Sequence, residues 1–329
     1  WSGFPICMKL TIRFYKELYM NSSLEQLFTF IDTHAKQMQS DENITYIEGV
    51  LETTELWLDG EISPKTNQIE KEDIRKAIQL AILKGMKEHV QPHHQMTPDS
   101  LGLLVGYFVD LLTKNKEHVA ILDPAAGTGN LLFTVLNFLQ GKATSSAVEI
   151  DDMLIRLAAS TGDLLQHPVT LYRQDALQPL MIDPVDVVVS DLPVGYYPDE
   201  KTASSYELQA KEGMSFAHHL MIEQSIRHTV DGGYLVLLVP QGIFESNQAK
   251  ELHTYFSKHA WMQAVIQLPT NLFKNEAHAK SLLVIQKKSA DLKQPKEVLL
   301  AKVPNMSNKE AMSLFFEKVN IWYKENTSR

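Results

Sequence analysis

The stretch Val119-Ala-Ile-Leu-Asp-Pro-Ala-Ala-Gly-Thr-Gly-Asn130 joins an apolar run to an acid and a glycine-rich loop. The run predicts a buried strand over residues 119–122, and the pattern after the loop predicts a helix from Leu131. Gly127 and Gly129 let the backbone turn tightly and approach a ligand closely. The start of the helix adds free N–H groups and a partial positive charge. This order of elements is typical of a ligand-binding α/β domain.

The loop differs from the common phosphate-binding motifs. A dinucleotide fingerprint needs G-x-G-x-x-G, and Leu132 stands at the third glycine position. The loop also has no lysine of the P-loop kind. Asp123, which precedes the loop, would repel a pyrophosphate but suits a cationic or amino-bearing ligand. Judged on the loop alone, a plain glycine-rich turn is the alternative.

Six further short apolar runs follow the same pattern, with helical stretches between most of them. They predict strands at residues 147–150, 169–172, 185–190, 234–239, 265–268 and 281–286. Near-continuous apolar strands with helical crossovers indicate a mostly parallel sheet that is covered on both faces. We therefore expect an α/β fold with a doubly wound, seven-stranded, Rossmann-like sheet. Ligands of such sheets bind at the carboxyl ends of the strands, so candidate residues belong where each strand stops.

Acids stand at three of these strand ends. Glu149 follows the glycine loop by about 20 residues, the separation at which an acid binds ribose hydroxyls in dinucleotide folds. Asp151 is better explained as a favourable acid at a helix start. Asp175 is a candidate acceptor for an exocyclic amine, with a turn-forming Asp as the alternative. Asp191 is followed two residues later by Pro193, which cannot continue a central strand, so we expect Asp191 to project into the cleft or to act as a capping residue.

The regions outside the sheet predict a helical module and a short tail. Between residues 20 and 90, apolar residues recur at helical spacing in three stretches, which favours a packing and partner-binding module. We divide the chain into residues 1–19, 20–92, 93–289 and 290–329. The last part predicts a strand at 298–302 and a helix beginning near Ser307, with Glu310 completing a capping box. Because Met20 followed by Ser22 and Ser23 is typical of a natural start and an N-cap, we interpret residues 1–19 as an upstream or added segment.

Composition narrows the class of protein. The 329 residues are 44% hydrophobic, with one cysteine and a net charge of −9. A single Cys7 excludes a disulfide framework and a cysteine-rich zinc site. No apolar run approaches the roughly 18 residues that span a bilayer, and no clean signal peptide is present, so we expect a cytoplasmic protein without membrane contact. Residues 20–95 carry 13 acids and 7 bases. If the protein binds a phosphate backbone, we therefore expect the binding surface to lie outside this acidic helical module.

The strand ends together resemble class I S-adenosylmethionine (SAM)-dependent methyltransferases of the adenine-N6 DNA methylase type. In particular, they look like YtxK-like relatives of the modification subunits of type I restriction systems. The resemblance covers about residues 95–288. It rests on residues 123–129, which are similar to the family's D-P-A-x-G-T-G loop, on Glu149, and on residues 191–194 in the place of the catalytic [N/D]-P-P-[Y/F]. Residues 238–240 and 268–273 also look like later strand ends of this family.

The resemblance implies a SAM site and a role for each residue. Residues 94–98 look like the segment that closes over the methionine part of the cofactor. Asp123 would meet the cofactor's amino group, Glu149 its ribose and Asp175 its adenine amine. The cofactor-binding set implied in this way is Thr97, Pro98, Asp123, Pro124, Ala125, Gly127, Thr128, Gly129, Asn130, Leu131, Glu149, Ile150, Asp175, Ala176 and Asp191. The catalytic set is Asp191, Pro193 and Tyr196.

The implied reaction is methyl transfer to an exocyclic amine of a nucleic-acid base, with DNA favoured over RNA as the substrate. The Asp of the motif and a backbone carbonyl accept the two amine hydrogens, and an aromatic stacks on the flipped base. This chain departs from the motif at Leu192 and Val194, and Tyr196 or Tyr197 would have to supply the ring. Methylation of RNA or protein is one alternative. A catalytically weak SAM-binding protein with a partner on its helical module is another.

We predict no metal site. His218 and His219 are adjacent on a predicted helix and therefore face different sides of it. The same argument is applied to His93 and His94.

Overall fold

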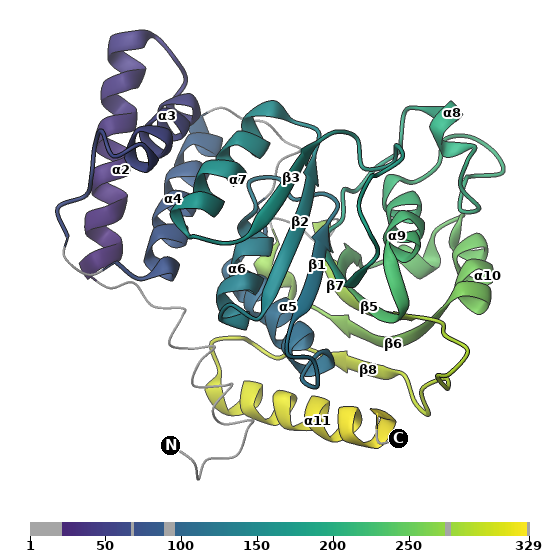
Figure 1. The fold of residues 1–329 in the computed structure, drawn as a ribbon. Helices are drawn as coiled ribbons and strands as arrows, with labels where there is room; N and C mark the ends of the chain where they lie inside the picture. The colour runs from purple at the N-terminus through teal and green to yellow at the C-terminus, as the bar shows by residue number, and fades with distance from the viewer. Residues whose placement is uncertain (1–21, 67–68, 89–95, 274–277, 328–329) are drawn as a thin grey trace.

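The computed structural model describes residues 22–66, 69–88, 96–273 and 278–327, and an eight-stranded sheet forms its centre (Figure 1). The strand order is β3-β2-β1-β4-β5-β7-β6-β8. The strands are β1 Val119–Asp123, β2 Ala143–Glu149, β3 Val169–Arg173, β4 Val185–Asp191, β5 Thr229–Pro240, β6 Ala260–Gln267, β7 Lys280–Lys287 and β8 Leu299–Lys302. The doubly wound, mostly parallel α/β sheet is confirmed, and the expected count of seven strands is wrong.

The eighth strand comes from the C-terminal part of the chain. β8 pairs in parallel with β6 at one edge of the sheet, with Ala264 opposite Leu299. The strand predicted at residues 298–302 is confirmed, but it was expected outside the sheet, and its pairing with β6 was not predicted. The last helix, α11 (Lys309–Thr327), follows it. Ser307 was the expected cap, and this is wrong, because the backbone N–H of Ala311 donates to Asn308 Oδ1 at 3.1 Å.

One strand of the sheet runs against the others. β7 pairs antiparallel with both β5 and β6, and its first residue, Lys280, lies opposite Pro240, the last residue of β5. The amino end of β7 therefore lies at the edge where the parallel strands end. This reversal brings a residue from the start of a strand to the ligand-binding edge.

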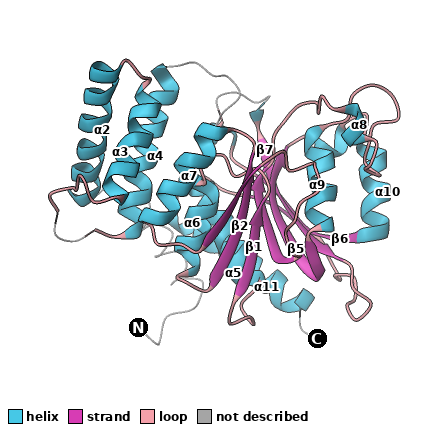
Figure 2. Cartoon of the chain, turned by 45° about the horizontal axis from the view of Figure 1, so that its top comes forward, coloured by secondary structure: helices cyan, strands magenta, loops and turns pink. Residues whose placement is uncertain are grey.

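Helices cover both faces of the sheet because its central strands are apolar on both sides (Figure 2). Along β5, Val236 and Leu238 belong to one hydrophobic cluster, and Leu235 and Leu237 belong to the other. α5 (Asp99–Leu112), α6 (Asn130–Leu139), α7 (Asp152–Leu164) and α11 cover the first face. α9 (Ala217–Arg227) and α10 (Ala249–His259) cover the second. Short turns of helix complete the chain at α8 (Glu200–Ala203), η1 (Ile243–Glu245) and η2 (Thr270–Leu272).

The described part of the N-terminal region is helical, as its apolar spacing predicted. It comprises α2 (Ser22–Glu42), α3 (Tyr46–Leu58) and α4 (Lys71–Glu88). A capping box starts α3, because Thr45 and Glu48 each accept a hydrogen bond from the other's backbone N–H. α3 and α4 pack on α6 and α7, outside the first helix layer, and α2 packs on α3 and α4 (Figure 1). Among the described residues, no helix has both the length and the apolar character needed to cross a membrane.

Candidate active site

The candidate site lies where the strand order reverses. β1 and β4 pair with each other. From β1 the chain continues to β2 on one side of this pair, and from β4 it continues to β5 on the other side. The adjacent strands β1, β4 and β2 end in the acids Asp123, Asp191 and Glu149. Open α/β sheets bind ligands at the carboxyl edge beside such a switch point. Three acids predicted from separate motifs therefore share one edge of the sheet.

Asp123 is a deeply buried acid that accepts two hydrogen bonds. Its side chain is 1% exposed, and its Oδ1 accepts from the backbone N–H of Ala125 at 3.1 Å and from the Ser190 hydroxyl at 2.8 Å. Burial raises its pKa to about 7, and the negative charges of Asp191 and Glu149 add to this rise. A cationic ligand group would favour the carboxylate form. The site therefore has the chemistry expected for an amino-bearing ligand.

Glu149 holds the glycine loop in place. Its Oε2 accepts from the backbone N–H of Gly127 at 2.8 Å. Its Oε1 accepts from Ile150 and Asp151 at 2.9 and 3.0 Å. Because a carboxylate offers about four acceptor positions, these three bonds leave capacity for a ligand hydroxyl. Glu149 thus connects the ends of β1 and β2.

The loop needs glycine at two positions. Gly127 has a φ of +55° and Gly129 has a φ of +77°, both in the left-handed region that other residues rarely adopt. A Cβ on Gly129 would lie 2.3 Å from the ring of Phe133. The loop can therefore pass close to a ligand while α6 begins directly after it.

Side chains predicted for the adenine part of a cofactor follow the ends of β2 and β3. Ile150 is 65% exposed and offers an apolar surface next to Glu149. Asp175 accepts from the backbone N–H of Leu177 at 2.9 Å and from the Tyr197 hydroxyl at 2.6 Å, which fixes its orientation. Its neighbour Ala176 is buried in the second cluster.

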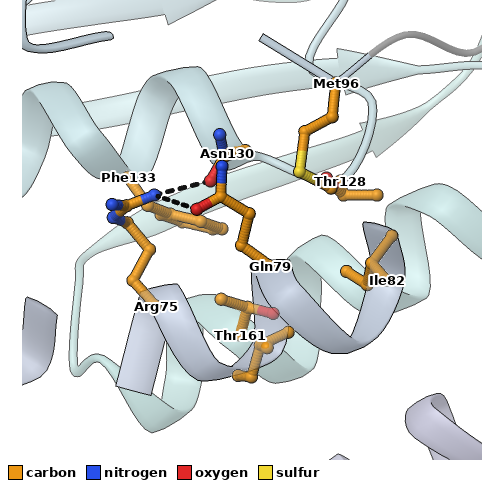
Figure 3. Close-up of a pocket in the computed structure, with 9 residues that line it drawn as sticks. Arg75, Gln79, Ile82, Met96, Thr128, Asn130, Phe133 and Thr161 are labelled. Carbon is orange, nitrogen blue, oxygen red and sulfur yellow. Dashed lines mark hydrogen bonds between the residues drawn. The ribbon is translucent and has the colours of Figure 1, made fainter. Parts of the chain in front are cut away.

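The remaining residues of the predicted loop support it in different ways. Leu131 is buried in the first cluster and packs in the core. Thr128 lines a small pocket next to Asn130 and Met96 (Figure 3). The Pro98 carbonyl accepts the first backbone bonds of α5, from Leu101 at 2.9 Å. Pro124 connects Asp123 to the loop, while His93, His94 and Gln95 lie outside the described residues.

Asp191 is held by two side chains. The Thr97 hydroxyl donates to its Oδ2 at 2.7 Å, and Lys280 Nζ pairs with its Oδ1. The same Nζ lies 3.5 Å from the carbonyl oxygen of Leu192. Lys280 therefore touches a carboxylate and a carbonyl at once, and these are the two kinds of acceptor that the family's motif offers an amine. Pro193 directly follows Asp191 and Leu192 in the chain.

The two tyrosines after the motif have different environments. Tyr197 is 8% exposed and bound to Asp175, whereas Tyr196 is 56% exposed. The Tyr196 ring stacks on Phe216, with centroids 4.9 Å apart and planes 13° apart. Val194, at the motif's aromatic position, is 62% exposed. Tyr196 and Phe216 thus form an aromatic surface beside Val194.

His218 and His219 lie on α9 behind this surface. The His218 ring stacks on Phe216 at 5.0 Å, and His219 is completely buried. Burial lowers their pKa values to about 3 and about 4, and the charge of Lys280 also lowers that of His218. Both rings are therefore neutral at physiological pH. Within the described ranges, no group of three His, Cys, Asp or Glu residues is arranged to hold a metal ion.

Four residues of the site region were missed by the sequence analysis: Ser190, Lys280, Phe216 and Arg75. Lys280 carried a usable signal, because a charged residue at the start of a buried strand lies at the ligand edge if that strand is antiparallel. Ser190 stood next to Asp191, and only the strand pairing shows that it faces Asp123. Phe216 and Arg75 gave no signal in their local patterns.

Comparison with known proteins decides the family. A model of the N-6 DNA methylase family matches residues 93–325, and a model of the YtxK N-terminal helical domain matches residues 25–86. The chain belongs to the N-6 DNA methylase family. Its YtxK-type helical domain thus precedes a class I methyltransferase fold, as the resemblance implied.

The similar proteins support this assignment. The chain is 44% identical over 319 residues to the uncharacterised YtxK protein of Bacillus subtilis (strain 168), covering 91% of this chain and 97% of that one. It is 41% identical to a protein of Listeria monocytogenes that is described as a candidate class I SAM-dependent methyltransferase. That comparison covers 93% of this chain and 100% of the other, with a TM-score of 0.87.

A more distant structure shares the fold. The modification subunit of a candidate type I restriction enzyme from Vibrio vulnificus matches with a TM-score of 0.62 at 15% identity. That match covers 80% of this chain and 60% of the other. At this identity the likeness shows the fold alone.

Proposed function

We propose that this N-6 DNA methylase family member transfers a methyl group from SAM to an exocyclic amine of a nucleic-acid base, with adenine N6 in DNA as the substrate. One observation carries the proposal. The Asp191 carboxylate and the Leu192 carbonyl both lie against one amine, that of Lys280. Two acceptors that converge on one nitrogen are what an amine-methylating site needs.

The residues at the ends of β1 and β2 fit SAM. Asp123 would bind the amino group, Glu149 the ribose hydroxyls and Ile150 the adenine ring. The buried carboxylate of Asp123, the spare acceptor capacity of Glu149 and the exposed Ile150 each match one part of the cofactor. When bound, SAM supplies an electrophilic methyl group. The chain's part is to hold it in line with the amine.

Asp191 and Leu192 would prepare the amine. An exocyclic amine is a poor nucleophile because its lone pair is delocalised into the ring. Donation of its two hydrogens to the Asp191 carboxylate and the Leu192 carbonyl shifts the nitrogen toward sp³ and aims its lone pair at the methyl group. The methyl group replaces one hydrogen, and the released proton passes to Asp191 and then to water. The side-chain role is positioning and electrostatics.

Tyr196 and Phe216 would supply the base stack that Val194 cannot. Stacking of a base on an aromatic ring is worth roughly 1–3 kcal/mol. Tyr196 is exposed and already oriented by Phe216. A base that stacks on Tyr196 would approach Asp191 from the side of the loop after β4. DNA is favoured over RNA by the family, and a protein partner on the helical domain is compatible with its acidic surface.

A second candidate function is supported by the same residues. Lys280 already occupies the two acceptors, and Val194 has no π face. These features favour a SAM-binding protein with weak transfer, which acts through a partner. Val194→Phe separates the readings. It should raise methyl transfer to nucleic acid about tenfold if the site is an adenine pocket, and leave transfer unchanged in a pure binding protein.

The transfer assay tests the proposal directly. The protein is incubated with labelled SAM and unmethylated DNA, RNA or cell extract, and modified nucleosides are identified by mass spectrometry. N6-methyladenine in DNA that is absent with Asp191→Ala supports the proposal. Label in RNA or protein would keep the enzyme class and change the substrate. SAM binding without any transfer would favour the binding protein.

A further inference from the structure

A buried arginine of the helical domain reaches the cofactor loop. Arg75, on α4, is 1% exposed. Its guanidinium donates to Glu72 of its own helix and to Asp99 at the start of α5, at 2.5 to 3.0 Å. Its Nη1 also donates to Asn130 Oδ1 at 2.6 Å and faces Gln79 at 3.4 Å (Figure 3). Asn130 is the first residue of α6, directly after the glycine loop.

A chain of hydrogen bonds continues from Asn130 to the acceptor. Asn130 Nδ2 donates to the backbone carbonyl of Thr97 at 2.9 Å. The Thr97 hydroxyl donates to Asp191 Oδ2 at 2.7 Å. Three consecutive bonds therefore connect Arg75 to the residue proposed to receive the target amine. The chain passes through two residues, Thr97 and Asn130, that belong to the implied cofactor-binding set.

The arrangement depends on a guanidinium. Its five N–H donors lie in a rigid plane, so one group can bind two carboxylates and an amide at the same time. Burial disfavours the charged form, but the carboxylates of Glu72 and Asp99 outweigh it and hold the pKa of Arg75 above its ordinary value. A lysine has a single nitrogen, so it cannot reproduce the fork in which Nε and Nη2 bind Glu72 while Nη1 binds Asn130.

We propose that Arg75 is a positioning residue for the methyl-transfer site, which makes the helical domain a working part of that site. By fixing Asn130, it sets the start of α6 and the segment at Thr97, and through them the orientation of Asp191. The inference rests on the proposed function, because it concerns the SAM site. Loss of Arg75 should weaken SAM binding while the protein is still folded.

Other contacts between the same two parts of the chain provide matched controls. The hydroxyls of Thr54 on α3 and Ser160 on α7 lie 2.9 Å apart and are buried. Arg156 on α7 donates to both oxygens of Glu55 on α3 at 2.9 Å, on the surface. These contacts dock the helical domain but do not touch Asn130 or Thr97. Thr54→Val and Arg156→Ala therefore loosen the docking without cutting the chain of bonds.

The test compares SAM affinity with stability. SAM is titrated calorimetrically into the wild type, Arg75→Met, Arg75→Lys, Thr54→Val and Arg156→Ala, and the Tm of each is measured. We expect Arg75→Met to raise the SAM Kd about tenfold. Arg75→Lys should recover part of the Tm but not the SAM affinity. The two controls should keep the SAM Kd within about twofold of the wild type, even where the Tm falls.

Two results would overturn the inference. The first is an Arg75→Lys variant that binds SAM with the same Kd as the wild type. This result can be obtained even if Arg75→Met fails to fold. The other is an equal loss of affinity in Thr54→Val at a similar Tm, which would reduce Arg75 to a docking contact. If the wild type itself binds no SAM, the proposed function fails and this inference falls with it.

Discussion

The two halves of the candidate site are built differently. At the ends of β1 and β2, the acids are bound mainly by backbone N–H groups: three donate to Glu149 and one to Asp123, which also accepts from the buried Ser190 hydroxyl. At the ends of β4 and β7, Asp191 is bound by the side chains of Thr97 and Lys280. Backbone donors are fixed by the loop's conformation, whereas side-chain donors can rotate away. The cofactor half is thus rigid, and the acceptor half is adjustable.

This difference explains where the family motif changes. Residues 123–129 keep the pattern D-P-A-x-G-T-G, whereas residues 192 and 194 replace a proline and an aromatic. In the first region, each glycine is needed for a positive φ and the acid before the loop is buried. In the second, Val194 is exposed and Tyr196 is available nearby. The halves should therefore respond separately to mutation.

Asp191→Ala should have the largest effect and should affect one half only. We expect methyl transfer to fall about a thousandfold, because the amine loses its charged acceptor. The SAM Kd should stay within a few-fold, since Asp123 and Glu149 are unchanged. Single-turnover transfer and calorimetry measure the two quantities. Retained turnover would mean that another residue accepts the amine hydrogens.

Glu149→Ala should break the other half. The substitution removes the ribose acceptor and frees three backbone N–H groups, so we expect the SAM Kd to rise about a hundredfold. Calorimetry measures this change, with Arg173→Ala, an exposed ion pair on the neighbouring strand, as the control. Unchanged SAM affinity in Glu149→Ala would refute the cofactor assignment.

The pH dependence sharpens the role of Asp123. Its pKa of about 7 means that the carboxylate form, which binds a cationic amino group, grows as the pH rises through 7. We expect SAM affinity to increase about tenfold between pH 6 and 7.5, and this slope to be absent in Asp123→Asn. Without ligand, the folding stability depends on pH in the opposite direction to the SAM affinity. Because the folded-state pKa is raised from 3.8, this group's contribution to stability is lost as the pH rises toward 7. An identical pH slope of SAM affinity in Asp123→Asn would argue against this role.

Lys280→Met gives the smallest expected effect. The ammonium competes with the target amine for Asp191 and Leu192, so its removal should lower the KM for the nucleic acid a few-fold at an unchanged SAM Kd. Steady-state kinetics measure the KM, and calorimetry measures the SAM Kd. Lys288→Met, a surface lysine on the Ser257 carbonyl, is a matched control. A higher KM in Lys280→Met would instead show that Lys280 contacts the substrate.

The sequence located the acids at the strand ends but not Lys280, and the reason is topological. Asp123, Glu149 and Asp191 each end a parallel strand, so the rule that ligands bind at strand ends finds them. Lys280 stands at the start of an antiparallel strand, so that rule does not identify it. The direction of β7 depends on long-range pairing with β5 and β6, which a local apolar run does not reveal.

Long-range packing also hid the burial of Arg75 and the pairing of the eighth strand, although the strand itself was predicted at residues 298–302. Arg75 follows Ile74 in an apolar stripe, and its local pattern is that of a surface residue at the border of a helix face. Its burial is decided by Asp99 and Asn130, which are 24 and 55 residues away in the chain. β8 joins the sheet by pairing with β6, more than 30 residues earlier in the sequence. In both cases, the partner is distant and the local signal is weak.

A crystal structure with S-adenosylhomocysteine and adenosine tests the division of the site most directly. We expect the cofactor product to lie along the ends of β1 and β2, with its amino group on Asp123 and its ribose on Glu149. The adenosine amine should take the place of Lys280 Nζ on Asp191 and Leu192. A structure in which S-adenosylhomocysteine binds elsewhere, or in which the adenosine amine contacts neither Asp191 nor Leu192, would contradict the proposed site.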